Sequence, residues 1–83
     1  MKKTIYSKHS VLIRDALKQI RQKAGLTQRE LCRRLHKEHT FISKCELGER
    51  RIDIAEFYWI CEACQASPKK EAGKLMEAFE SIK

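Results

Sequence analysis

The sequence lacks the long apolar runs, alternating strand patterns and low-complexity segments that mark several classes of protein. No apolar stretch approaches the roughly 18–20 residues of a membrane span, and the opening MKKTIYSKHS has no apolar signal-peptide core. There is one proline, and no run of alternating β-branched residues predicts a sheet. Helix-forming residues dominate, so we expect one all-α domain in the cytoplasm, without a membrane partner.

Acidic residues are scarce in only one part of the chain. Residues 1–51 contain fourteen Lys and Arg against five Asp and Glu, a net charge of +9, whereas residues 52–83 carry a net charge of −2. A basic surface confined to one part of a small domain is typical of proteins that contact phosphates. A merely solubilising face is the alternative, and the motif in the same residues argues against it.

Residues 26–50, LTQRELCRRLHKEHTFISKCELGER, predict two short helices joined by a tight turn. Thr27 with Glu30 three positions later has the pattern of a capping box, in which each residue satisfies an amide of the other. A second helix is expected to begin near Glu38, after a turn of about three residues, and to end at Gly48. The apolar residues at helical spacing, which we expect to face inward, are Leu31, Cys32, Leu35, Ile42 and Cys45.

The residues L-T-Q-x-E-L, followed by F-I-S-K-x-E-x-G-E-R, resemble the phage-repressor/Cro (XRE-type) class of helix-turn-helix regulators. The resemblance covers residues 10–66 and is densest over residues 26–51. It implies a five-helix, lambda-repressor-like domain that binds double-stranded DNA. The implied function is that of a sequence-specific transcriptional regulator, expected to be a repressor, that is not an enzyme and needs no cofactor.

The resemblance also assigns residues to contacts with DNA. The third helix is expected to enter the major groove, where its solvent-facing residues would contact bases. These predicted base contacts are His39, Thr40, Ser43 and Lys44. The predicted phosphate contacts are Thr27, Gln28, Arg29, Arg33, Lys37, Arg50 and Arg51, whereas Arg34 is interpreted as a solvated surface charge.

Four further positions bear on how this motif is held. Arg21 and Glu46 match positions that form an internal ion pair between the first and third helices of phage repressors, so a structural role is expected for both. His36 stands where the family usually has glycine, and we expect it to adopt positive φ. Glu38 replaces the usual serine or threonine cap of the third helix.

The remaining elements are expected to complete a helical bundle. Residues 1–9 are interpreted as a basic N-terminal arm, residues 10–24 as the first helix, and residues 10–66 as the helix-turn-helix domain. A fourth helix is expected from Asp53 to about residue 66, and a fifth from Ser67–Pro68 to about residue 82.

Residues 67–83 are expected to mediate homodimerisation. The predicted dimer interface consists of Trp59, Leu75, Met76 and Phe79. The alternative is that the fifth helix covers Trp59 within the same subunit.

The four cysteines, which include the C-x-x-C of residues 61–64, raise a different possibility of function. Since they fall on apolar helix faces, we interpret them as small buried hydrophobic residues and expect no metal site. Three alternatives remain open: an antitoxin, whose partner would be a toxin protein; a restriction-system controller protein; and a cysteine-based metal or redox sensor. An enzyme is disfavoured because no acid–base pair or activated nucleophile is evident.

Overall fold

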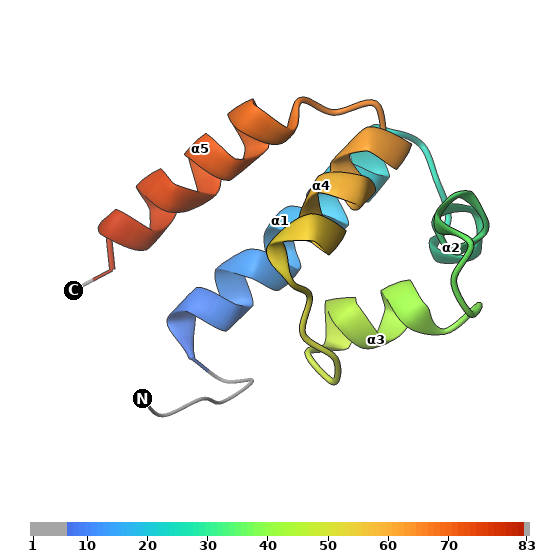
Figure 1. The fold of residues 1–83 in the computed structure, drawn as a ribbon. Coiled ribbons are helices and arrows are strands. Elements are labelled where there is room, and N and C mark those ends of the chain that lie inside the picture. The colour runs from blue at the N-terminus through green and yellow to red at the C-terminus, as the bar shows by residue number, and fades with distance from the viewer. Residues whose placement is uncertain (1–6, 83) are drawn as a thin grey trace.

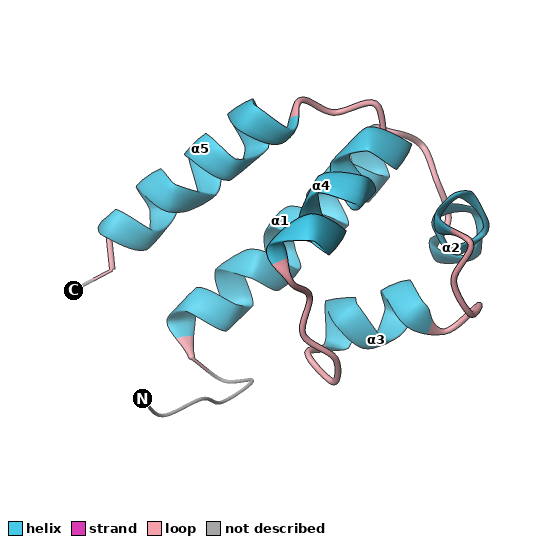
Figure 2. Cartoon of the chain, in the orientation of Figure 1, coloured by secondary structure: helices cyan, strands magenta, loops and turns pink. Residues whose placement is uncertain are grey.

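The computed structural model describes residues 7–82, and over that range it contains α-helices and no strand (Figure 2). The helices are α1 (Lys8–Lys23), α2 (Gln28–Leu35), α3 (Phe41–Leu47), α4 (Ile54–Ala63) and α5 (Pro68–Glu80). The predicted all-α, five-helix architecture is therefore confirmed. Within the described part of the chain, no helix is both long enough and apolar enough to cross a bilayer.

The helices are arranged around α1 and α4. α1 contacts α3 and α5, α2 contacts α3 and α4, and α4 also contacts α5. In Figure 1, α2 and α3 lie together at the right of the molecule, away from the beginning of α1 and the end of α5 at the left. The two helices of the motif thus form one end of the bundle, and α5 packs at the other.

The hydrophobic core draws on every helix, because each has an apolar face at helical spacing. All four cysteines belong to it, and Cys61 is completely buried. This confirms their predicted role as small apolar core residues. The buried core residues are Leu17, Ile20, Leu26, Leu31, Cys32, Phe41, Ile42, Cys45, Phe57, Ile60, Cys61, Cys64 and Leu75.

Side-chain caps determine where most of the helices begin. The capping box of Thr27 and Glu30 is present, and a second one joins Asp53 and Glu56 at the start of α4. Ser7 accepts a hydrogen bond from the Ser10 amide at 3.0 Å, so α1 begins at Lys8 and not at residue 10. Residues 8 and 9, which were predicted as part of the N-terminal arm, therefore lie in α1, and the prediction for residues 1–6 falls outside the described residues.

Helix ends also depart from the sequence prediction in two places. α3 begins at Phe41, not near Glu38, because the Glu38 carbonyl accepts the Phe41 amide in a turn. Residues 36–40 therefore connect the two helices, and His36 adopts the expected left-handed conformation (φ 57°). α4 ends at Ala63, because Gln65 has positive φ and the Ala66 amide turns back to the Cys61 carbonyl.

Candidate nucleic-acid interface

A buried polar network fixes the position of the two motif helices relative to α1. The Arg21 guanidinium donates to both carboxylate oxygens of Glu46, with Nε–Oε2 2.7 Å and Nη2–Oε1 3.1 Å. It also donates to the Leu26 carbonyl at 2.9 Å. The side chains of Arg21 and Glu46 are only 11% and 6% exposed. The predicted ion pair is therefore present, and it links α1 to α3.

Gln28 extends this network to α2. Its Nε2 donates to Glu46 Oε1 at 2.8 Å, so the same carboxylate receives side chains from α1 and α2. One N–H of the Gln28 amide is thereby used inside the protein. Its second N–H is the donor that remains for the predicted phosphate contact.

The N-terminus of α2 lies at the protein surface and is capped by two hydrogen bonds. Thr27 Oγ1 accepts from the Glu30 amide at 3.1 Å, and the Thr27 amide donates to Glu30 Oε1 at 2.8 Å. The hydrogen bond that the Thr27 amide donates is the largest cause that lowers the pKa of the Glu30 carboxyl. The Thr27 hydroxyl thus caps the helix, in addition to its predicted place beside a phosphate. Arg29 and Arg33 are exposed on the same helix.

The predicted base contacts lie on the exposed side of the third helix and the turn before it. His39 and Lys44 are exposed, whereas Thr40 and Ser43 are half-buried. Phe41, Ile42 and Cys45, in the same helix, are buried in the core. α3 is thus anchored by one face and leaves the predicted reading residues on the other.

Arg50 was expected to contact a phosphate, but its guanidinium is paired with a carboxylate of the same protein. Its guanidinium donates to both oxygens of Glu56, at 3.0 and 2.8 Å, and to the Arg51 carbonyl. It also lies over the Phe41 ring, 4.8 Å from the centroid. Because its charge is compensated by Glu56, the structure gives Arg50 an internal role. Arg51 is exposed beside it.

Glu56 is a further residue of this site, which the sequence predicts only as a capping-box partner of Asp53 at the start of the fourth helix. It is only 6% exposed, and Lys37 also approaches it, with Nζ–Oε2 at 4.0 Å. The Lys37 ammonium lies 5.2 Å from the Phe41 ring centroid, so both cations contact the residue that begins α3. The hydrogen bonds from Arg50 hold the pKa of the Glu56 carboxyl below its ordinary value. Its capping-box position gave a signal for helix initiation, but nothing in the sequence signalled the pairing with Arg50.

Two other arginines bind backbone carbonyls across the fold. Arg34 Nη1 donates to the Ala63 carbonyl at 2.9 Å, near the end of α4, so it is not simply a solvated charge. Arg14 Nη1 donates to the Leu47 carbonyl at 3.1 Å, at the end of α3. The next residue, Gly48, has φ 83°, and a Cβ there would lie 2.7 Å from Arg14 Nη1. The αL cap and this close approach together favour glycine at that position.

The four predicted dimer residues do not share one exposed surface. Leu75 is 8% exposed and packs in the core, and Phe79 is half-buried, with its ring 4.9 Å from that of His9. Leu75 and Phe79 therefore face inward within the subunit, because that side of α5 covers α1 and α4. Trp59 and Met76 are 51% and 50% exposed.

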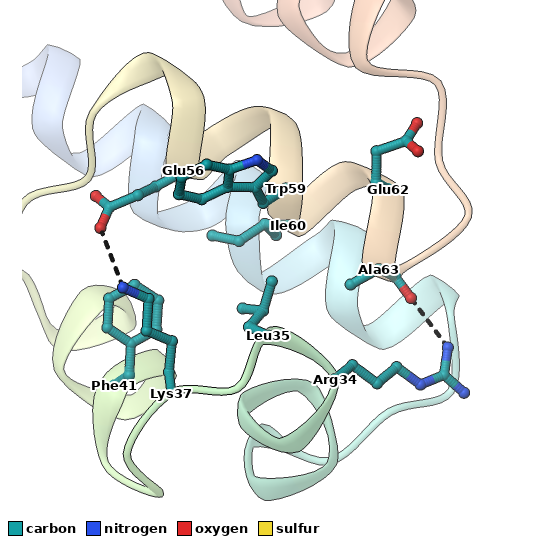
Figure 3. Close-up of a pocket in the computed structure, with 9 residues that line it drawn as sticks. All are labelled: Arg34, Leu35, Lys37, Phe41, Glu56, Trp59, Ile60, Glu62 and Ala63. Carbon is teal, nitrogen blue, oxygen red and sulfur yellow. Dashed lines mark hydrogen bonds and ion pairs between the residues drawn. The ribbon is translucent and has the colours of Figure 1, made fainter.

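Trp59 lies in a groove that α5 does not enter. Figure 3 shows the groove between α4 and the motif helices, with the Lys37–Glu56 and Arg34–Ala63 contacts on its sides. Its volume is about 370 Å³. The alternative in which α5 covers Trp59 within the subunit is therefore wrong. The lining residues are Arg34, Leu35, Lys37, Phe41, Glu56, Trp59, Ile60, Glu62 and Ala63.

Burial reduces the reactivity of the cysteines. It raises the pKa of the Cys45 and Cys61 thiols to about 11, and it also raises that of Cys64. The thiolate, which is the reactive and metal-binding form, is thereby disfavoured. Among residues 7–82, no three His, Cys, Asp or Glu side chains are grouped so that they could hold a metal ion.

Comparison with known proteins identifies the family to which the chain is similar and a solved structure with a similar fold. The profile of the helix-turn-helix domain family matches residues 13–72. Among solved structures, a point mutant of the restriction-modification controller protein C.Esp1396I has a similar fold, with a TM-score of 0.78 and 23% sequence identity. That similarity covers 93% of this chain and 98% of the other. A comparison with curated protein sequences finds no match.

Proposed function

The chain belongs to the helix-turn-helix domain family, and we propose that it is a sequence-specific, double-stranded DNA-binding transcriptional regulator, with repression as its expected mode. The observation that carries this proposal is the placement of α3. Its apolar face is buried, and its position is held by the Arg21–Glu46 ion pair. Its opposite face carries the exposed Lys44 and the half-buried Ser43. A helix presented in this way suits the major groove. The proposed activity is binding, with no catalytic step.

Within this proposal, α3 and the turn before it read the bases. Lys44 can donate to guanine O6 and N7, and Thr40 can contact a thymine methyl group or form a hydrogen bond to a base. His39 can donate or accept, so its preferred base is not specified by its chemistry. Ser43 is half-buried, as is Thr40, so both are less accessible than His39 and Lys44.

The proposed phosphate contacts surround these residues. Arg29, Arg33 and Arg51 are exposed, and their guanidinium groups provide charge-assisted donors. Thr27 and Gln28 lie at the N-terminus of α2, where free amides also favour an anion. The Lys37 ammonium, which lies near Glu56, would also contact a DNA phosphate. We remove Arg50 from the proposed set, because Glu56 occupies its guanidinium.

We also propose that the protein binds a palindromic operator as a homodimer, with apolar residues of α4 and α5 at the interface. Trp59 and Met76 are the exposed members of the predicted interface. On α4, Ile54 and Tyr58 are likewise exposed, at 78% and 50%, and lie one helical turn apart. Several exposed apolar side chains on a small domain favour a protein partner. Leu75 would support this surface from within.

A second candidate is a restriction-system controller protein. The structural similarity to C.Esp1396I favours it, since the two chains match over nearly their full lengths. Such a controller would use the same DNA-reading surface, so the two proposals differ in the regulated genes and not in the chemistry. An antitoxin would differ by also binding a toxin protein.

Selection of bound duplexes from a random DNA pool tests the proposed function. We expect an enriched palindrome whose half-sites are about one helical turn apart, because two α3 helices related by a two-fold axis would read it. An enriched single half-site would support DNA reading and reject the dimer. A pool that shows no enriched sequence would reject sequence-specific binding.

A further inference from the structure

The first turn of α3 differs from the beginning of every other described helix. α1, α2, α4 and α5 each begin with a cap residue whose side chain accepts a backbone amide: Ser7, Thr27, Asp53 and Ser67. α3 also begins with a residue suited to this role, Thr40, but its side chain forms no such hydrogen bond. A free amide in the first turn therefore requires another acceptor.

That acceptor comes from the preceding helix. The Ile42 amide, at the second position of α3, donates to Cys32 Sγ in α2 at 3.4 Å. This is one of the amides that a cap side chain ordinarily receives. Ile42 and Cys32 are 2% and 1% exposed, so water cannot replace the sulfur. A buried amide without any acceptor would carry the full cost of its lost hydration.

We propose that Cys32 is a positioning residue, which caps α3 from α2 and thereby leaves the Thr40 hydroxyl available to DNA. This inference rests on the proposed function, because Thr40 is valuable to DNA only if α3 reads bases. The sulfur is a weak acceptor, but it is held against the amide by core packing. Any small apolar residue would fill the buried space at position 32, whereas the hydrogen bond from the Ile42 amide requires an acceptor atom.

The substitution Cys32→Ala removes the acceptor. Thr40 is the residue suited to replace it, but its backbone would have to leave the αR conformation (φ −99°, ψ −2°) to bring the hydroxyl to the amide. In the full-length protein, we expect the ratio of affinities for the selected operator duplex and a scrambled duplex to fall about 5- to 30-fold, the equivalent of one hydrogen bond. Cys32→Ser restores an acceptor and should keep the ratio near that of the wild type. Cys61→Ala is the matched control, because it removes an equally buried thiol from α4.

The double variant, Cys32→Ala with Thr40→Ala, distinguishes an effect on the Thr40 hydroxyl from a general loosening of the core. If Cys32→Ala acts by drawing Thr40 into the cap, it should not lower the ratio further in a Thr40→Ala background. An equal fall in both backgrounds would overturn the proposal. A fall in Cys32→Ser or in Cys61→Ala as large as that in Cys32→Ala would also overturn it.

Hydrogen exchange of the Ile42 amide, followed by NMR without DNA, tests the cap itself. We expect Cys32→Ala to speed exchange at Ile42 relative to other α3 amides, because a cap from Thr40 requires its αR backbone to move. Cys32→Ser should retain protection. Unchanged protection at Ile42 in Cys32→Ala would overturn the proposal. A wild-type protein that binds both duplexes equally would reject the proposed function, whereas selective loss of Ile42 protection would still support the cap.

Discussion

The α2–α3 region and the α4–α5 region are held by different kinds of contact. Around α2 and α3, directional polar contacts add to the apolar packing: the Glu46 carboxylate receives Arg21 and Gln28, and Glu56 at the start of α4 receives Arg50. α5, by contrast, packs through apolar residues such as Leu75, and its neighbour α4 exposes Trp59 to solvent. Charge divides in the same way, with +9 in residues 1–51 and −2 in residues 52–83.

This difference indicates what each region must achieve. Reading bases requires α3 to be held within a narrow range of orientations, and buried hydrogen bonds and ion pairs define orientation better than apolar packing does. Self-association requires apolar area and little mutual repulsion, which the α4–α5 region offers. The predictions below separate the two regions, from the largest expected effect to the smallest.

Removal of the Glu46 carboxylate should have the largest effect. Glu46→Ala leaves the buried Arg21 guanidinium without its partner, so we expect the free energy of unfolding to fall by about 3–5 kcal/mol in urea denaturation. Glu49→Ala is the control, because Glu49 is exposed near the same end of α3, and it should change stability by less than about 0.5 kcal/mol. Equal effects of the two variants would show that the network does not hold the motif.

The Arg50–Glu56 pair should make stability depend on pH. The pKa of Glu56 is lowered in the folded protein, so its contribution is present above the unfolded pKa of about 4.3 and is lost as the pH falls through the folded value. Glu56→Gln should cost about 1–3 kcal/mol at pH 7, with the lower half expected because the Arg50 side chain is 41% exposed.

Urea unfolding between pH 7 and pH 3 measures this dependence. The unfolding free energy of the wild type should fall more steeply below about pH 4.3 than that of Glu56→Gln. Glu62→Gln, on the exposed side of α4, should retain the wild-type slope. The same slope in all three proteins would contradict a lowered pKa at Glu56.

Substitutions on the exposed apolar surface should affect association and leave folding intact. We expect Trp59→Ala and Met76→Ala each to weaken self-association by about 1–2 kcal/mol. The subunit should stay folded, although its unfolding free energy should fall by about 1–2 kcal/mol because about half of each side chain is buried within it. Sedimentation at micromolar concentration measures the first effect, with Gln65→Ala as a polar, exposed control. A wild-type protein that sediments as a monomer, with or without DNA, would reject the dimer.

Single phosphate contacts should have the smallest effects. Arg33→Ala should weaken binding to the selected and the scrambled duplex alike, and should reduce the slope of log affinity against log salt concentration by about one per subunit. Arg50→Ala should leave that slope unchanged if Glu56 occupies Arg50 as the structure indicates. A decrease in slope for Arg50→Ala, equal to that for Arg33→Ala, would return Arg50 to the phosphate contacts.

Much of the fold could be predicted because its signals are local. The capping boxes, the glycine stops and the apolar spacing of each helix depend on residues a few positions apart, and the capping box of Thr27 and Glu30 is found where its pattern indicated. The prediction that His36 takes positive φ was also confirmed. The start of α3 was predicted wrongly, because the turn from Glu38 to Phe41 carries no distinctive residue pattern.

The partners of the polar side chains were harder to predict, since they are distant in the sequence. The Arg21–Glu46 pair was expected only because a family resemblance supplied it. Arg34 and Arg50 were indistinguishable from phosphate-contacting or solvated residues until the fold placed a carbonyl and a carboxylate beside them. Similarly, the inward face of α5 was recognised as apolar, but the sequence could not specify whether its partner was the same subunit or a second one.

The affinity ratio of the wild type and Lys44→Ala for the selected duplex and a scrambled duplex, measured at one salt concentration, tests the central claim most directly. The wild type should prefer the selected duplex by about 10³-fold or more. Lys44→Ala should lose about 1–3 kcal/mol of that preference while binding the scrambled duplex almost as well as the wild type does. A wild-type ratio near one, or a ratio that Lys44→Ala leaves unchanged, would contradict the assignment of α3 as the DNA-reading helix.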